Sequence, residues 1–171
     1  NLARALRTNN SERAAFEAAW MAHAITDGLT PAHHFPLEQA MAELRGGEGL
    51  ETRTSILKKN LMKGDNGIEL IKNNWKFWGA KGMMTTHVAF EAGVASVVSY
   101  PRFKDAIPSD DEISQVKNYG YREYYLNQVH AVASMKMYDN FSKSGWTTDL
   151  AWQTNHELMP IIIKSVRSEE H

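Results

Sequence analysis

One helix end organises this chain, and residues 22–34 there read AHAITDGLTPAHH. His23 and Asp27 are four residues apart, so on a helix their side chains lie one above the other on the same face. His33 follows beyond the helix end. Because two ligand-type side chains share a face and a third lies just past the turn, this stretch predicts part of a metal site.

The turn within this stretch has its own signals. Gly28 is placed to end the helix, because the residue after the last turn often adopts a left-handed backbone that glycine tolerates. Pro31 then stiffens the reversal of the chain. We therefore expect His33 to return toward the helix face that carries Asp27.

Composition places the chain among globular proteins. It has 171 residues, 43% of them hydrophobic and 23% charged, which suits one domain with a core of its own. The net charge of -1 gives no overall sign of a nucleic-acid or anionic-membrane partner. We expect one helical domain over residues 1–171, and Asn1 in place of Met leaves open that it is the C-terminal part of a longer chain.

Cysteine is absent, so any metal site must use His, Asp or Glu, and disulfides are excluded. No apolar run approaches the length of a membrane span, and no signal-type leader opens the chain. The compartment and the oligomeric state stay open at this stage.

Helical spacing of apolar residues recurs along the chain and predicts an all-α bundle of six to eight helices. In the alanine-rich segment 11–27 the stripe of Phe16 and Trp20 leads to His23 and Asp27, which predicts a buried face that opens into a polar pocket. The later helices have their own start and stop signals. These are a capping box at Ser109–Glu112, a break at Gly120, a cap at Thr147 or Thr148 and a kink at Pro160. The other expected helices cover residues 36–45, 50–62, 68–78, 83–99 and 121–142.

A second pair of ligand-type residues lies on the expected helix 83–99. His87 and Glu91 are one turn apart within an apolar stripe. A hydrogen-bonded core pair is one interpretation. Metal ligation is the other, because burying two ionisable groups without a partner is costly.

Together the two segments form H-x3-D-x3-P-x-H followed by H-x3-E, with ligand candidates His23, Asp27, His33, His87 and Glu91. Imidazole and carboxylate ligands suit zinc, and two histidines with one carboxylate leave a coordination position for water. Zinc makes such a water more acidic, and the water can then attack a phosphorus or carbonyl centre.

At these residues the sequence resembles the zinc-dependent phospholipase C and S1/P1 nuclease superfamily, whose members are all-helical phosphoesterases with usually three zinc ions. The resemblance implies that His23 and Asp27 bind the paired metals, with Asp27 bridging. It also implies that His33, His87 and Glu91 bind the remaining one, and it favours an extracytoplasmic location. The resemblance covers these short segments of the chain.

Two features set this chain apart from the superfamily pattern. Position 1 is Asn where members have a zinc-binding Trp, and no histidine precedes His23, so one to three ions remain open. The gap between His33 and His87 is longer than usual, which implies an inserted pair of helices. Three histidines outside the signature are further candidates to complete a different site: His34, His130 and His156.

The segment 58–81 carries six lysines interleaved with Trp75, Phe77 and Trp78. A basic, aromatic surface can hold phosphate backbones and stacked bases. We expect instead that the aromatic residues are core and the lysines a solvated face, because that arrangement is commoner on amphipathic helices.

The sequence thus predicts a zinc-dependent phosphoesterase that uses a metal-bound water on phosphodiesters, with nucleic acid and phospholipid both open as substrates. The alternative is a non-enzymatic helical interaction or scaffold domain with a structural metal or a degenerate site. The two differ in coordination, because a structural ion is closed by four protein ligands and a catalytic ion keeps one position open.

Overall fold

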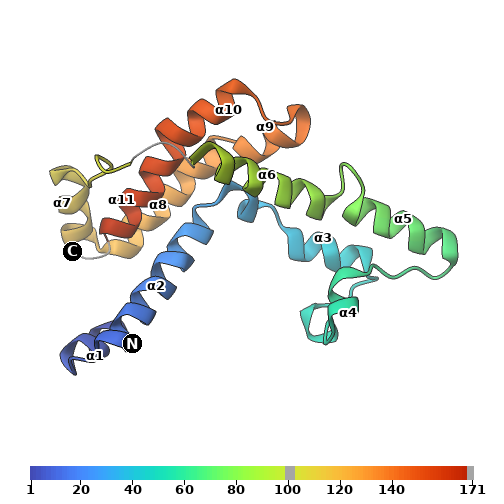
Figure 1. Ribbon diagram of the computed structural model, residues 1–171, viewed down its shortest axis with the longest axis horizontal. Coiled ribbons are helices and arrows are strands. Elements are labelled where there is room, and N and C mark those ends of the chain that lie inside the picture. Colours follow the sequence, from blue (N-terminus) through green and yellow to red (C-terminus); the bar gives the residue numbers. More distant parts are fainter. Residues whose placement is uncertain (99–102, 169–171) are drawn as a thin grey trace.

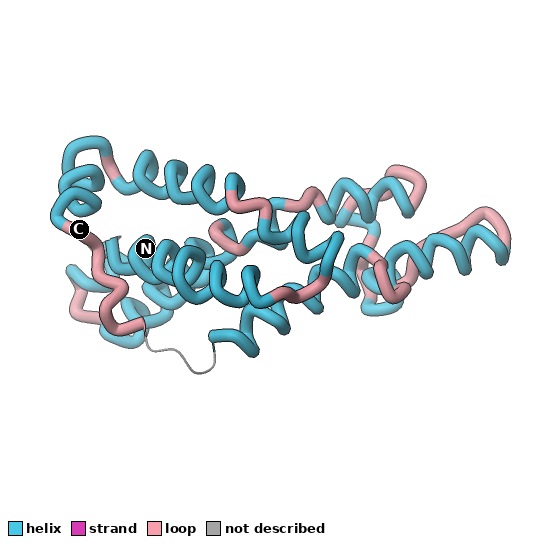
Figure 2. The backbone as a smooth tube through the Cα atoms, turned by 90° about the horizontal axis from the view of Figure 1, so that it is seen from above, coloured by secondary structure: helices cyan, strands magenta, loops and turns pink. Residues whose placement is uncertain are grey.

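The computed structural model describes residues 1–98 and 103–168, and all regular structure within these ranges is helical (Figures 1 and 2). The all-α prediction is confirmed. Eight of the described α-helices have eight or more residues, in line with the six to eight expected, and three are shorter. None of the described helices is long and apolar enough to cross a bilayer.

Two of the short elements, η1 and η2, are 3-10 turns, and η3 is a π-helical turn. The elements in chain order are α1 (Leu2–Arg7), α2 (Ser11–Gly28), η1 (Pro31–His34), α3 (Leu37–Leu44), η2 (Leu50–Thr52), α4 (Ile56–Asn60), α5 (Gly67–Trp78), α6 (Met83–Val98), α7 (Asp110–Tyr119), α8 (Tyr121–Ser134), α9 (Met137–Ser144), α10 (Thr148–Gln153), η3 (Thr154–Leu158) and α11 (Met159–Ser168).

The first of two regions, which we call the body, consists of the end of α2, η1, α6 and the helices from α7 onward (Figure 1). One continuous apolar core fills it. Its buried members are Ile25, Leu29, Ala32, Phe90, Val132, Met137, Tyr138, Phe141, Leu150, Leu158 and Ile162.

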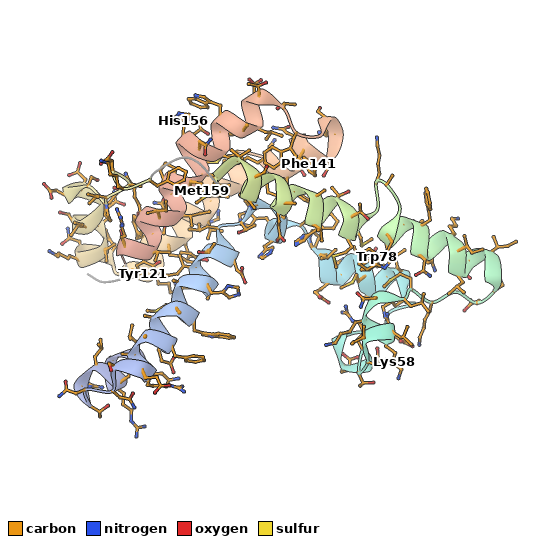
Figure 3. The ribbon with its side chains drawn as sticks, viewed as in Figure 1. Lys58, Trp78, Tyr121, Phe141, His156 and Met159 are labelled. Carbon is orange, nitrogen blue, oxygen red and sulfur yellow. The ribbon has the colours of Figure 1, made fainter. Side chains whose placement is uncertain are left out.

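The second region, which we call the arm, is formed by α3, α4 and α5 and projects from the body at the start of α6 (Figure 1). Its apolar cluster has only three buried members, Met41, Met62 and Phe77. Figure 3 shows Lys58 and Trp78 on this arm, away from Phe141 in the body. The arm is the segment between His33 and His87, and it contains three α-helices where an inserted pair was expected.

The prediction of one continuous helix over residues 50–62 of the arm is wrong. Residues 50–62 form η2 and the five-residue α4, with a bend between them. Arg53 lies in this bend with its side chain buried and paired to Glu38 of α3, so the chain turns inward there. The backbone just after α4 is extended instead of helical. Met62 is held there by the side-chain amide of Asn74 on α5, which accepts from the Met62 N–H (3.1 Å) and donates to the Met62 carbonyl (2.9 Å).

Two expected apolar faces are exposed. In α2, Phe16 and Trp20 are 55% and 65% exposed, because the first part of that helix leaves the body and packs against α1. The prediction of a buried α2 stripe is therefore wrong. In α5, Phe77 is buried as expected, whereas Trp75 and Trp78 are exposed, so the core prediction fails for these two.

The later helices follow most of their sequence signals. The capping box at Ser109, the break at Gly120 and the Thr147 cap are confirmed. The π-helical turn η3 precedes Pro160, which has no N–H to continue an α-helical ladder. The expected helix 83–99 is present through residue 98, and residue 99 lies outside the described ranges.

The single helix expected over residues 121–142 is wrong, because the chain breaks after α8. Lys136 adopts a left-handed backbone with φ of 51°, and α9 starts at the next residue. This change of direction turns Met137, Tyr138 and Phe141 into the core of the body.

Candidate metal centre

The turn after α2 is anchored in the body by its apolar residues. Leu29 and Ala32 are fully buried in the core. The Thr30 hydroxyl donates to the Thr26 carbonyl (2.8 Å), which ties the chain beyond α2 back to the helix. The chain therefore leaves α2 in a fixed direction, and η1 presents His33 near the helix end.

The orientation of α6 depends on one aromatic side chain. Phe90 is fully buried and packs its ring against Tyr138 and Trp146, both at 5.5 Å between centroids. His87 lies one turn before Phe90 and Glu91 directly follows it, so burying Phe90 sets the direction of both ligand candidates. The two residues face η1 as a result, and each contacts His33.

Gly93 is required for this packing. A β-carbon there would lie 1.7 Å from the indole nitrogen of Trp146, so even alanine would displace the ring. The same indole N–H donates to the Ala89 carbonyl (3.3 Å). The close approach of Trp146 thus fixes α6 along the turn that carries Glu91.

The central group of the site is His33, His87 and Glu91. The Nε2 atoms of His33 and His87 lie 3.1 Å and 3.0 Å from the same Glu91 oxygen, Oε1. The two imidazole rings are parallel within 4°, with centroids 5.3 Å apart. One ligand atom from each of the three residues lies within 4.8 Å of the others.

This donor set fits a divalent cation such as zinc. Ligand atoms bound tetrahedrally at 2.0–2.1 Å from zinc lie about 3.3 Å apart, close to the two Nε2–Oε1 distances. The Nδ1 atom of His87 is buried without a hydrogen-bond partner among the described residues. The polar contact of the His87 ring is therefore made through Nε2, toward Glu91.

His23 and Asp27 form a second pair beside this group. Asp27 Oδ2 lies 3.2 Å from His23 Nε2, and its other oxygen lies 3.8 Å from Nδ1 of His33. Contacts thus run from His23 through Asp27 and His33 to Glu91 and His87. All five sequence-predicted residues are brought together, although the compact three-donor group contains only the last three.

Gly28 has a different role from the expected one. It adopts no positive φ, so the predicted left-handed helix end is wrong. Instead, a β-carbon at Gly28 would lie 1.9 Å from the hydroxyl oxygen of Tyr125 on α8. Glycine is needed here because the Tyr125 side chain approaches the helix end closely.

Two tyrosines lie next to the site without any signal in the sequence. Burial and the charge of Asp27 raise the pKa of Tyr125, and burial and the charge of Glu91 raise the pKa of Tyr138. The Tyr138 ring also meets His87 edge-on at 6.4 Å. No local spacing distinguishes these tyrosines from neighbouring core residues, so the sequence carries no signal for them.

The remaining histidines considered as ligands make other contacts. His34 Nε2 bonds to the Gly28 carbonyl (2.9 Å), which closes the turn. His156 bonds through Nδ1 to the Trp152 carbonyl and stacks on the Trp152 ring. His130 is exposed on α8. Over the residues the structure describes, none of the three joins the metal-ligand group.

Comparison of the chain with protein-family models, with curated proteins and with solved structures finds no match.

Proposed function

We propose that the chain is a metal-dependent phosphodiesterase, with zinc as its cation, of the kind found in the phospholipase C and S1/P1 nuclease superfamily. The observation that carries the proposal is the convergence of two imidazole Nε2 atoms on one carboxylate oxygen, at 3.0–3.1 Å. A catalytic zinc ion has three protein ligands and an open position, and this group supplies three.

The charge of the site also supports a cation and an anionic substrate held by it. Asp27 and Glu91 are two carboxylates among three histidines, so the cluster is negative while its histidines are neutral. A bound divalent cation would make a coordinated water more acidic at neutral pH and would stabilise negative charge on phosphorus oxygens.

The residues of the chain have separate tasks in this proposal. His33, His87 and Glu91 would hold one ion, and His23 and Asp27 would hold any further ion. The Tyr138 ring meets His87 edge-on at 6.4 Å, and burial and the charge of Glu91 raise the pKa of its phenol, so Tyr138 would serve as a protonated hydrogen-bond donor beside the group.

The proposal covers nucleic acid and phospholipid as substrates. Beside His23 the exposed rings of Trp20 and Phe16 stack at 6.2 Å and 12°, which offers a flat surface to a planar group. A phospholipid headgroup has no planar base to stack on these rings, so a single-stranded oligonucleotide and a phosphatidylcholine dispersion belong side by side in the assay.

The test combines metal content with hydrolysis of bis(p-nitrophenyl) phosphate. The chain, loaded with zinc, is expected to hydrolyse the diester, to stop in EDTA and to recover when zinc is returned. Glu91→Gln is expected to lose both zinc and activity, whereas His130→Ala, which removes an exposed histidine outside the group, keeps both.

Two outcomes would overturn the proposal in different ways. A chain that takes up no zinc even after zinc addition has a hydrogen-bonded polar cluster instead of a metal site. A chain that binds zinc through these residues but hydrolyses none of the diesters is the scaffold domain with a structural ion.

A further inference from the structure

The outer face of α5 is an exposed apolar stripe. Ile68, Ile71, Trp75 and Trp78 follow one another at intervals of three, four and three residues, so they share one side of the helix. Their exposed fractions run from 46% to 81%. The buried Phe77 lies on the opposite side, against α3, so the α5 stripe takes no part in the core of the arm.

Lysines flank the α5 stripe. Lys72 is four residues after Ile68 and three before Trp75, and Lys76 follows four residues later, so both are neighbours of the stripe along the helix. Both are exposed, and neither forms an ion pair within the described part of the chain. The helix thus presents an apolar band with a positive edge to solvent.

The positive charge is concentrated in this part of the molecule. Residues 56–81 contain six lysines, one aspartate and one glutamate, a formal charge of +4. The whole chain has a charge of -1, so the remaining residues carry -5. An electrically balanced composition therefore conceals a basic segment over α4 and α5, whereas residues 37–55 of the arm, with four glutamates and two arginines, carry -2.

Exposed apolar residues continue from α5 onto the neighbouring helix α4. In α4 and just after it, Ile56, Leu57 and Leu61 are exposed. The indole N–H of Trp78 donates to the Asn60 carbonyl (2.7 Å), which joins the end of the α5 stripe to the end of α4. A recess of about 1080 Å³ opens between α3, α4 and α5, and its lining mixes leucines with lysines and carboxylates.

We propose that the arm docks on the surface of an anionic lipid bilayer, with the α5 stripe in the headgroup layer and the lysines on the lipid phosphates. Interfacial helices bind bilayers with this combination of an apolar face, tryptophan and lysine. The proposal is independent of the proposed enzymatic function, because it uses none of the residues of the metal centre.

The exposed side chains of α4 and α5 favour a bilayer over nucleic acid and over a second copy of the chain. Nucleic acid binds through aromatic stacking and basic residues, and the exposed isoleucines Ile56, Ile68 and Ile71 would contribute to neither. A second copy packed face to face would bring two basic surfaces together, which like charges oppose. An anionic bilayer satisfies the apolar band and the positive edge at once.

The experiment is cosedimentation of the full chain with large unilamellar vesicles, in EDTA so that no metal bridges protein to lipid. The chain is expected to bind phosphatidylcholine vesicles that contain about 30% phosphatidylserine, and to bind pure phosphatidylcholine far more weakly. Raising the salt from about 0.1 M to 1 M should weaken the binding, because salt screens the lysine contacts.

Two variants test the two halves of the docking surface. Lys72→Glu/Lys76→Glu is expected to lower the apparent affinity by more than about tenfold. Ile71→Ser/Trp75→Ser is expected to lower it to a similar extent and to remove the blue shift of tryptophan emission on vesicles. Lys117→Glu/Lys143→Glu makes the same change in total charge on α7 and α9 and should bind as the parent chain does.

Circular dichroism of each variant checks that the helices persist. The proposal is overturned if phosphatidylserine vesicles do not retain the parent chain, or if the control variant loses as much binding as the arm variants. It is also overturned if single-stranded oligonucleotide binds the arm in preference to vesicles, or if sedimentation velocity shows a dimer that the α5 stripe variant abolishes.

Discussion

The body and the arm are built from similar helices but are held together differently. Eleven buried residues form one core in the body, whereas three form the core of the arm. In the arm, side chains such as Arg45 and Asn74 bond to backbone carbonyls in place of apolar packing. The extensive core of the body holds the five candidate ligands in place, whereas the small core of the arm leaves apolar side chains of α4 and α5 exposed.

The largest loss of stability is expected when a fully buried phenylalanine is replaced, and each region has one. Phe90→Ala should lower the free energy of unfolding of the body by about 3–5 kcal/mol, because the ring packs on Tyr138, Phe141 and Trp146. Phe77→Ala should melt the arm and leave the body folded. Hydrogen exchange read by mass spectrometry distinguishes the two, since each variant should lose protection in its own region only.

If Phe77→Ala lowered the protection of α8 and α11 as much as Phe90→Ala does, the two regions would be one cooperative unit. The contrast drawn between the body and the arm would then be wrong.

Glycine substitutions give the next largest contrast. Gly28→Ala places a methyl group 1.9 Å from the Tyr125 hydroxyl and should destabilise the body by about 1–3 kcal/mol. Gly67→Ala, at the first turn of α5, meets no atom within 4 Å and should be neutral or slightly stabilising. Urea unfolding followed by circular dichroism measures both. Equal effects would show that the Tyr125 approach imposes no constraint.

Helix caps offer a matched pair of smaller effects. Thr147 accepts from the Leu150 N–H in the body (3.2 Å), and Asn66 accepts from the Glu69 N–H in the arm (3.0 Å). Thr147→Ala should cost the body about 1 kcal/mol. Asn66→Ala should fray α5 and leave the thermal midpoint of the body unchanged. A drop in that midpoint for Asn66→Ala would contradict the independence of the arm.

The smallest effect depends on pH. Burial works to raise the pKa of Glu112, but the Ser109 N–H and the Lys164 ammonium outweigh it and lower that pKa below its ordinary 4.5. A lowered folded pKa stabilises the fold above that ordinary value, and the gain is lost as the pH falls through the folded pKa. Glu112→Gln should therefore cost less than about 1 kcal/mol at pH 7 and nothing at low pH.

The arm provides the control for this titration. Glu48 pairs with Lys63, which lowers the Glu48 pKa, but the pair lies at the surface. Glu48→Gln should leave the unfolding of the body unchanged at both pH values. If Glu112→Gln cost as much at pH 3 as at pH 7, the charge of Glu112 would not be what stabilises the contact between α7 and α11.

Local spacing was sufficient to predict much of the fold and the residues that meet at the site. The i, i+4 pairs His23–Asp27 and His87–Glu91 lie on helices as expected, and the turn at Pro31 brings His33 to both. That the five residues bind metal stays a prediction. Spacing could bring together the residues of each i, i+4 pair because helix geometry alone places them on one face.

What spacing could not predict depends on contacts between distant segments. Periodicity shows that Trp20 or Trp75 shares a helix face with its neighbours, but whether another helix covers that face is decided elsewhere in the chain. The left-handed backbone at Lys136 has no glycine or asparagine to signal it. Tyr125 and Tyr138 reach the site only through the packing of α8 and α9.

The most direct test of the central claim is a zinc titration of the chain by calorimetry. We expect the chain to bind at least one zinc ion, His87→Ala to weaken that binding by more than about tenfold, and His130→Ala to bind zinc as the parent chain does. Absence of zinc binding by the parent chain, or an equal affinity in His87→Ala, would contradict a metal centre built from His33, His87 and Glu91.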